Sequence, residues 1–244
     1  MTAKENVMGR SRVWETATAS GIVVLIALML VMVMHHPVAR HADPAELMTS
    51  IARQASSDRW VHGILAGAMT VMTSIMLGFA GRLGLRRPHV LLGAVCSGLA
   101  LVLICQAVLL DGFVAPALAR PCALIGGQCV REAQALLGFG ALQIEFMTRL
   151  ALFCLTSATG LWAADLAFRQ DRSRLAGALG LLSAAVQLGV LVLGGERLNP
   201  HNLALFVMAE AIWYLAVASV IAFQHGPFSA DAISVKDHGT RPPG

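Results

Sequence analysis

Three ionisable residues interrupt long apolar segments of the chain and are the first candidates for chemistry. Glu145 and Arg149 stand four residues apart, and Glu210 lies about two helical turns into a later segment. Charge at membrane depth is costly, so such groups normally face the interior of a helix bundle and have a partner. A carboxylate four residues before an arginine also shares its helix face, in the order that favours an internal ion pair. Asp165 and Arg169 have the same spacing but fall at the end of a segment, where we expect a solvated pair.

Amide and imidazole side chains extend this set, because each falls in the outer or middle part of a different apolar segment. The predicted ligand-binding or buried polar network consists of Glu145, Arg149, Glu210, Gln106, Gln187 and His62. In a functional interpretation, the arginine binds an anionic group and one glutamate holds a proton or a cation in an outward-facing cavity. In a structural interpretation, the same groups hydrogen-bond between helices and only fix their packing. Both interpretations stay open.

Several histidines gather near the predicted outer face and raise the alternative of a metal centre. Imidazole is the commonest metal ligand, and His36, His41 and His62 stand where the first two apolar segments emerge. No His-x-x-x-His or Glu-x-x-His pair accompanies them. We therefore predict no cofactor, with a haem- or metal-dependent redox protein as the alternative.

Two cysteines stand close together outside the apolar segments. Cys122 and Cys129 flank a short loop, and a disulfide would close this loop if the compartment is oxidising. A metal pair is the alternative, but no third and fourth ligand with zinc-like spacing follows. The sequence thus predicts a structural disulfide on the outer side of a membrane.

Composition places the chain in a membrane, because 57% of its residues are hydrophobic and only 13% are charged. Six apolar runs approach or exceed the roughly 20 residues that a helix needs to cross the hydrocarbon. They cover residues 17–34, 60–80, 89–110, 135–168, 175–193 and 203–223. We expect an all-α integral membrane bundle of six transmembrane helices over residues 17–224. A polar arm, 1–16, precedes it, and a Gly- and Pro-containing tail, 225–244, should be disordered.

Basic residues predict the orientation, since Lys and Arg are retained on the cytoplasmic side. The segments on the side of the two termini contain eleven: Lys4, Arg10, Arg12, Arg82, Arg86, Arg87, Arg169, Arg172, Arg174, Lys236 and Arg241. The opposite segments contain six: Arg40, Arg53, Arg59, Arg120, Arg131 and Arg197. Both termini are therefore predicted to be cytoplasmic. A membrane protein gains its basic bias in this way, so we infer no nucleic-acid partner.

The first outer loop contains a helix-start signal. Asp43 suits an N-cap, Pro44 suits the first helical position, and Glu46 suits a capping box. Apolar residues then recur at helical spacing, which predicts a short amphipathic helix at the outer membrane boundary. We expect it to act as a connector.

Small residues at four-residue spacing predict close helix contacts. Gly63 and Gly67 form one pair, Gly93 and Ser97 another, and Gly180 begins a third. Such pairs let helix backbones approach, either within the chain or across a dimer.

The stretch from Ser57 to Gly63, together with the capped helix and the His36-Pro37 pair, resembles small multi-pass bacterial inner-membrane proteins without an assigned function. The resemblance covers mainly the first two spans and their loop. It implies a plasma-membrane location and carries no site residues to this chain.

No nucleotide-binding or catalytic motif is found in the sequence, which favours a role other than an enzyme. The leading hypothesis is a protein that binds or moves a small solute, ion or lipid-like molecule through an outward-facing polar cavity. The alternatives are the redox protein above and a structural or assembly subunit of a membrane complex. The expected partners are the lipid bilayer and either a second copy of the chain or a membrane partner subunit.

Overall fold

A computed structural model describes residues 3–35, 43–169, 173–193 and 200–223, and their regular structure is helical throughout. The predicted tail at 225–244, as well as His36 and His41, lie outside the described residues. The elements in chain order are α1 (Ala3–Met34), α2 (Pro44–Leu83), α3 (Pro88–Leu109), the π-helical turn η1 (Leu110–Val114), α4 (Ala115–Ile125), α5 (Gly127–Ala167), α6 (Ser173–Leu193) and α7 (Pro200–Phe223).

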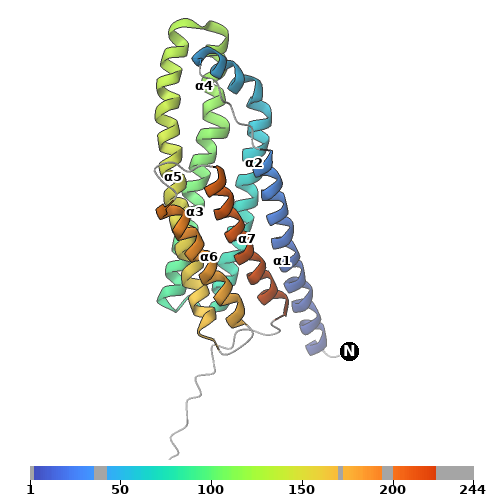
Figure 1. Cartoon of the computed structure of the whole chain (residues 1–244). Helices are drawn as coiled ribbons and strands as arrows, with labels where there is room; N and C mark the ends of the chain where they lie inside the picture. Colours follow the sequence, from blue (N-terminus) through green and yellow to red (C-terminus); the bar gives the residue numbers. More distant parts are fainter. Residues whose placement is uncertain (1–2, 36–42, 170–172, 194–199, 224–244) are drawn as a thin grey trace, which may run out of the picture.

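Six helices of the described chain are long and apolar enough to cross a membrane, with α3, η1 and α4 forming one of them. This confirms the predicted class, an all-α membrane helical bundle. The beginning of α1 and the end of α7 lie at the same end of the bundle (Figure 1), as six crossings require. We call this the terminal end, and we call the opposite end, where α4 meets α5, the hairpin end.

Three of the six helices extend far past the others at the hairpin end (Figure 1). The helix α2 has 40 residues, α3 to α4 have 38, and α5 has 41. At 1.5 Å per residue each spans about 60 Å, roughly twice the thickness of a bilayer's hydrocarbon core. The predicted short amphipathic helix was therefore wrong as a separate element, because its residues are the first turns of α2. Likewise, the third and fourth segments continue beyond their predicted limits at 110 and 135.

The start of α2 follows the predicted signal. The side chain of Asp43 accepts a hydrogen bond from the backbone nitrogen of Glu46 at 3.0 Å, and Pro44 is the first helical residue. This satisfies one of the amides that a helix N-terminus leaves without a partner. The other end of α2 reaches Gly84, whose φ of +108° suits glycine and turns the chain into α3.

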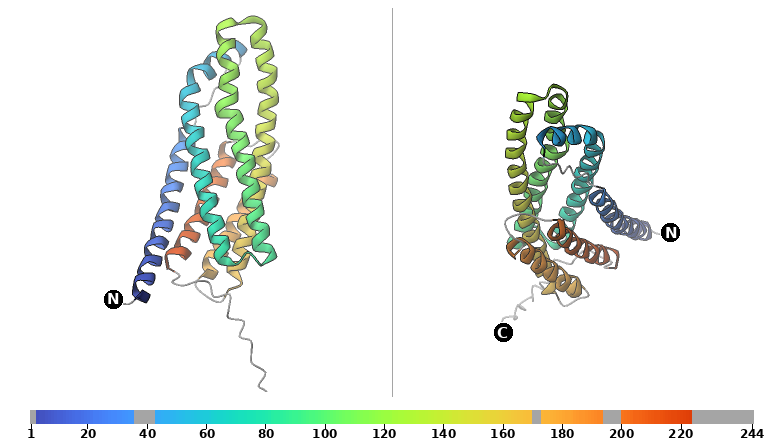
Figure 2. Two further views of the ribbon diagram at one scale, coloured as in Figure 1. Left: turned by 180° about the vertical axis from the view of Figure 1, so that it is seen from behind. Right: turned by 45° about the horizontal axis from the view of Figure 1, so that its top comes forward.

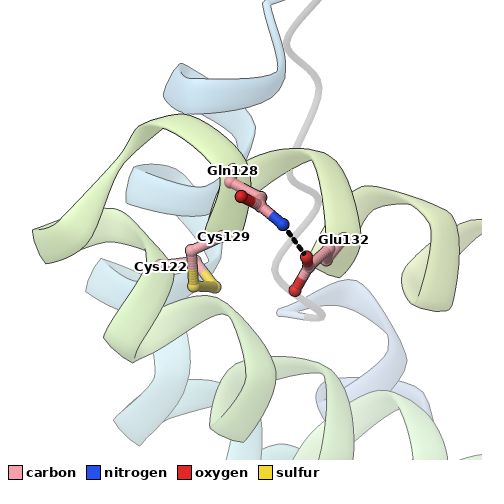
Figure 3. The surroundings of a disulfide bond; sticks show 4 residues. All are labelled: Cys122, Gln128, Cys129 and Glu132. Carbon is pink, nitrogen blue, oxygen red and sulfur yellow. Dashed lines mark hydrogen bonds between the residues drawn. A yellow bond between two sulfur atoms is a disulfide. The ribbon is translucent and has the colours of Figure 1, made fainter.

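The three-helix extension has a small core of its own and a covalent tie at its tip. Met48 of α2 packs with Ala119 and Cys122 of α4 and with Val130 of α5. A disulfide joins Cys122 to Cys129, between the end of α4 and the beginning of α5 (Figure 3). The connection is thereby fixed at the hairpin end.

Helices α5, α6 and α7 pack most closely in the terminal half. A methyl group on Gly177 of α6 would overlap the backbone of α5 at Ala167, so this contact requires glycine. Gly180 faces Trp213 in the same way, and Gly93 faces Trp162, which agrees with the predicted close contacts. Figure 2 shows α1 and α6 on the two sides of α7, and α7 contacts both. By contrast, Gly63 and Gly67 face no atom within 4 Å.

Candidate functional site

A carboxyl group lies inside the bundle. Glu210 of α7 is only 6% exposed. The amide nitrogen of Gln187 on α6 donates a hydrogen bond to it at 2.5 Å, and the hydroxyl of Thr159 on α5 lies 3.3 Å and 3.4 Å from its two oxygens. Tyr214, one turn later on α7, also hydrogen-bonds to it. Three helices thus aim neutral donors at one carboxyl group.

The amide of Gln187 is itself held in place. Its nitrogen also lies 3.2 Å from the hydroxyl of Ser183, which donates to the backbone oxygen of Ala209 at 2.6 Å. The tight packing of α6 on α5 and α7 through small residues brings these groups within reach. The amide oxygen of Gln187 is buried and has no hydrogen-bond partner among the described residues. A buried acceptor without a partner is uncommon and marks a place where a donor is missing.

The lone pairs of Glu210 leave room for one more donor. A carboxyl group offers about four acceptor positions when it is ionised, and Gln187, Thr159 and Tyr214 reach Glu210 as donors. Within the described residues, no basic side chain pairs with Glu210. The carboxyl group and the adjacent oxygen of Gln187 therefore form a pair of acceptors without a cation.

Glu210 lies on the wall of a cavity of about 240 Å³ between α1, α2, α3, α5 and α7. The other lining residues are mostly apolar: Val33, Leu65, Met69, Met72, Ala100, Leu101, Ile104, Val108, Ala151, Leu152, Leu155, Leu203, Phe206 and Val207, with Thr73, Ser97, Thr148 and Tyr214. The predicted outward-facing polar cavity is thus an apolar cavity at membrane depth. Its polar lining residues are Glu210, Tyr214, Thr73, Ser97 and Thr148.

The structure divides the six predicted network residues instead of gathering them. Glu210 and Gln187 hydrogen-bond to each other, and of the two only Glu210 lines the cavity. Glu145 and Arg149 form their own ion pair along α5 at 3.2 Å, with both side chains about one-third exposed. Gln106 is exposed on α3. The local pairing of Arg149 favours the structural interpretation for that arginine.

His62 belongs to a separate cluster near the start of the extension. Its Nδ1 lies 2.9 Å from the backbone oxygen of Asp58 and 3.0 Å from that residue's carboxylate, and its Nε2 lies 3.2 Å from Asp111. Only an imidazolium offers two N–H donors, so this geometry suits the protonated ring and not a metal ligand. Asp111 stands in the π-helical turn η1, and the next residue, Gly112, packs directly on His62. A methyl group on Gly112 would lie 2.5 Å from the Cβ of His62.

Among the described residues, no group of three or more His, Cys, Asp or Glu side chains is arranged to hold a metal ion. Of the predicted metal set, His36 and His41 lie outside the described residues. His62 has the acidic neighbours just described.

A third cluster closes the terminal end. Asp165 is buried and accepts hydrogen bonds from Arg169, from Arg87 and from His89. The expectation of a solvated pair was wrong, because the turn between α2 and α3 folds over the carboxylate. The i,i+4 spacing correctly identified Arg169 but gave no signal for the other two groups.

Sequence reasoning missed Thr159, Ser183 and Tyr214 as members of the Glu210 site. Hydroxyl residues are common in membrane helices, so Thr159 and Ser183 carried no distinctive signal. Tyr214 did carry one, because it stands four residues after Glu210 and therefore on the same helix face. No protein-family model, curated protein or solved structure matches the chain.

Proposed function

We propose that this protein binds, within the membrane, a small and mostly apolar molecule that carries a cationic or hydrogen-bond-donating end, and that Glu210 receives this end. The observation that carries the proposal is a buried carboxyl group on the wall of an apolar cavity, next to an amide oxygen without a partner. Intramembrane ionisable groups are costly and are typically retained for a site.

The charge of the site favours an amine. A carboxylate removed from water without a cation is unfavourable, and a bound ammonium group would supply that cation. The same ammonium group has three donors, so it can hydrogen-bond to Tyr214 on the cavity wall as well as to Glu210. An anionic ligand would be repelled by the carboxylate of Glu210. The guanidinium group of Arg149 pairs with Glu145 and does not line the cavity.

The size and lining of the cavity favour a short hydrocarbon body. Its volume is about 240 Å³, and an apolar cavity of about 150 Å³ already holds benzene. Charge and volume together therefore support a lipophilic amine as the solute. We propose that it reaches the site from the bilayer.

We also propose that the chain lies in a bacterial plasma membrane with its terminal end in the cytoplasm. Arg82, Arg86 and Arg87 stand in or beside the turn between α2 and α3 at this end, and basic residues favour the cytoplasmic side. The disulfide lies at the other end, which suits an oxidising compartment.

The test compares three ligands that share an eight-carbon chain: octylamine, octanol and octanoate. Each is added to the protein in nanodiscs, and the thermal unfolding midpoint is measured, because a ligand that binds only the native state raises it. Octylamine should raise the midpoint of the wild type more than octanol, and octanoate should have the least effect. Glu210→Gln, which keeps the shape and removes the charge, should abolish the preference for octylamine.

Glu132→Gln is the matched control, because Glu132 is exposed on α5 and interacts with Gln128, outside the cavity. It should keep the wild-type preference. If Glu210→Gln fails to accumulate, the wild type can be treated with dicyclohexylcarbodiimide, an apolar reagent for carboxyl groups. Octylamine should slow the modification of Glu210 detected by mass spectrometry. Equal effects of all three ligands, or no protection, would refute the proposal.

A further inference from the structure

Two arginines without partners face a groove on the outside of the bundle, away from the Glu210 cavity. Arg59 of α2 and Arg120 of α4 line this groove of about 550 Å³ together with Ser56, Trp60, Gly63 and Ile64. Within the described part of the chain, neither arginine forms an ion pair or a side-chain hydrogen bond. The Nε of Arg59 is buried, and no residue that the structure describes hydrogen-bonds to it. Two guanidinium groups thus share one groove that no acidic residue lines.

The direction of the helices brings the two guanidinium groups together. Helix α2 runs from the hairpin end to the terminal end, and α4 runs the opposite way (Figure 1). Because side chains lean toward the N-terminus of their helix, Arg59 leans toward the hairpin end and Arg120 toward the membrane. Both directions point into the groove that the two arginines line.

Helix length places Arg59 at the level expected for lipid headgroups of the leaflet at the hairpin end. Arg59 precedes Leu83, the last residue of α2, by 24 positions. This corresponds to about 36 Å of helix, slightly more than the roughly 30 Å of a hydrocarbon core. Trp60 is 71% exposed beside it, as is typical of residues at the membrane interface.

An open strip continues from the arginines into the hydrocarbon region. Gly63 and Gly67 are exposed on α2, and a methyl group on either would meet no atom within 4 Å. Gly63 also lines the groove, so this strip begins beside the two arginines. A phosphate beside the two arginines and a hydrocarbon chain along Gly63 and Gly67 would match the charged part and the open part of this surface.

We propose that this groove binds an anionic phospholipid of the leaflet at the hairpin end, with its phosphate between Arg59 and Arg120 and an acyl chain along Gly63 and Gly67. Arginine binds phosphate through two parallel N–H groups, which gives these pairs both strength and geometry. Two positive charges favour a headgroup with net negative charge over phosphatidylcholine, whose ammonium group they repel. Phosphatidylglycerol is therefore the preferred class.

The experiment is native mass spectrometry of the purified protein after equilibration with mixed micelles that contain equal amounts of phosphatidylglycerol and phosphatidylcholine. The wild type should retain one phosphatidylglycerol in preference to phosphatidylcholine. The double variant Arg59→Gln/Arg120→Gln should retain at least about tenfold less, because it loses charge-assisted hydrogen bonds. Gly67→Leu, which fills the strip but keeps both arginines, should also reduce retention.

The matched control is Arg53→Gln/Arg131→Gln. It makes the same change in net charge at two exposed arginines outside the groove, and it should retain phosphatidylglycerol like the wild type. Equal retention of the two lipids by the wild type, or wild-type retention by Arg59→Gln/Arg120→Gln, would overturn the proposal. A wild-type dimer that Gly67→Leu dissociates, without any retained lipid, would also overturn it and assign the strip to a second copy of the chain.

Discussion

Replacing Asp165 by asparagine removes the negative charge at the centre of the cluster that closes the terminal end. One carboxylate oxygen accepts hydrogen bonds from Arg87 at 2.6 Å and from His89 at 3.0 Å. The other accepts two from Arg169, at 2.6 Å and 3.1 Å. Asparagine keeps the volume but has only one oxygen. Whichever oxygen is replaced, an NH₂ group then faces a donor.

The cost can be estimated from the exposure of the partners. The side chain of Asp165 is 4% exposed and that of Arg169 is 17% exposed, so their two hydrogen bonds to one carboxylate oxygen together count as a charged hydrogen bond, about 1.5–3 kcal/mol. Arg87 and His89 are 46% and 44% exposed, which reduces each interaction to about 0.5 kcal/mol. Because asparagine retains part of this network, we expect Asp165→Asn to lower the free energy of unfolding by about 2–3 kcal/mol.

Unfolding by sodium dodecyl sulfate in mixed micelles measures this difference directly. Glu132→Gln serves as the control, since an exposed substitution of the same type should change stability by less than about 0.5 kcal/mol. A double-mutant cycle with Arg169→Gln should show that most of the loss is shared by the two residues. If Asp165→Asn matches the control, the buried cluster does not stabilise the bundle and this reasoning fails.

Three further predictions concern helix packing, the disulfide and the orientation in the membrane. Gly177→Ala should lower the free energy of unfolding by about 1–3 kcal/mol, because the added methyl group overlaps the backbone of Ala167. Gly189→Ala on the same helix is the control and should be neutral or stabilising, because a methyl group there meets no described atom within 4 Å. Equal unfolding curves for the two variants would contradict the contact. Removing the Cys122–Cys129 bond by Cys122→Ser should cost about 2 kcal/mol through loop-closure entropy. In intact cells, the thiol left at Cys129 should react with a membrane-impermeant maleimide, and labelling only after lysis would contradict the proposed orientation.

The amino-acid sequence alone predicted the features that depend on local spacing or on composition. Six apolar runs identified the membrane-crossing helices, because hydrocarbon requires a continuous apolar segment of known length. The cap at Asp43 and the ion pair between Glu145 and Arg149 could also be predicted, because in each the two partners lie only three or four residues apart. Hydropathy failed at the helix ends, however. Hydropathy reports where a helix enters water and not where the helix stops, so the projecting turns of α2 and of α3 to α4 were not predicted as parts of those helices.

Only the tertiary structure decided which polar groups meet. Glu210 hydrogen-bonds to Gln187 and Thr159, which are 23 and 51 residues away in the sequence. Asp165 hydrogen-bonds to Arg87, which is 78 residues away. Helical periodicity gives the face on which a side chain lies, but the neighbour of that face depends on how the helices are ordered in the bundle. That order is fixed by close contacts such as the one at Gly177, whose fit depends on shapes from several helices at once.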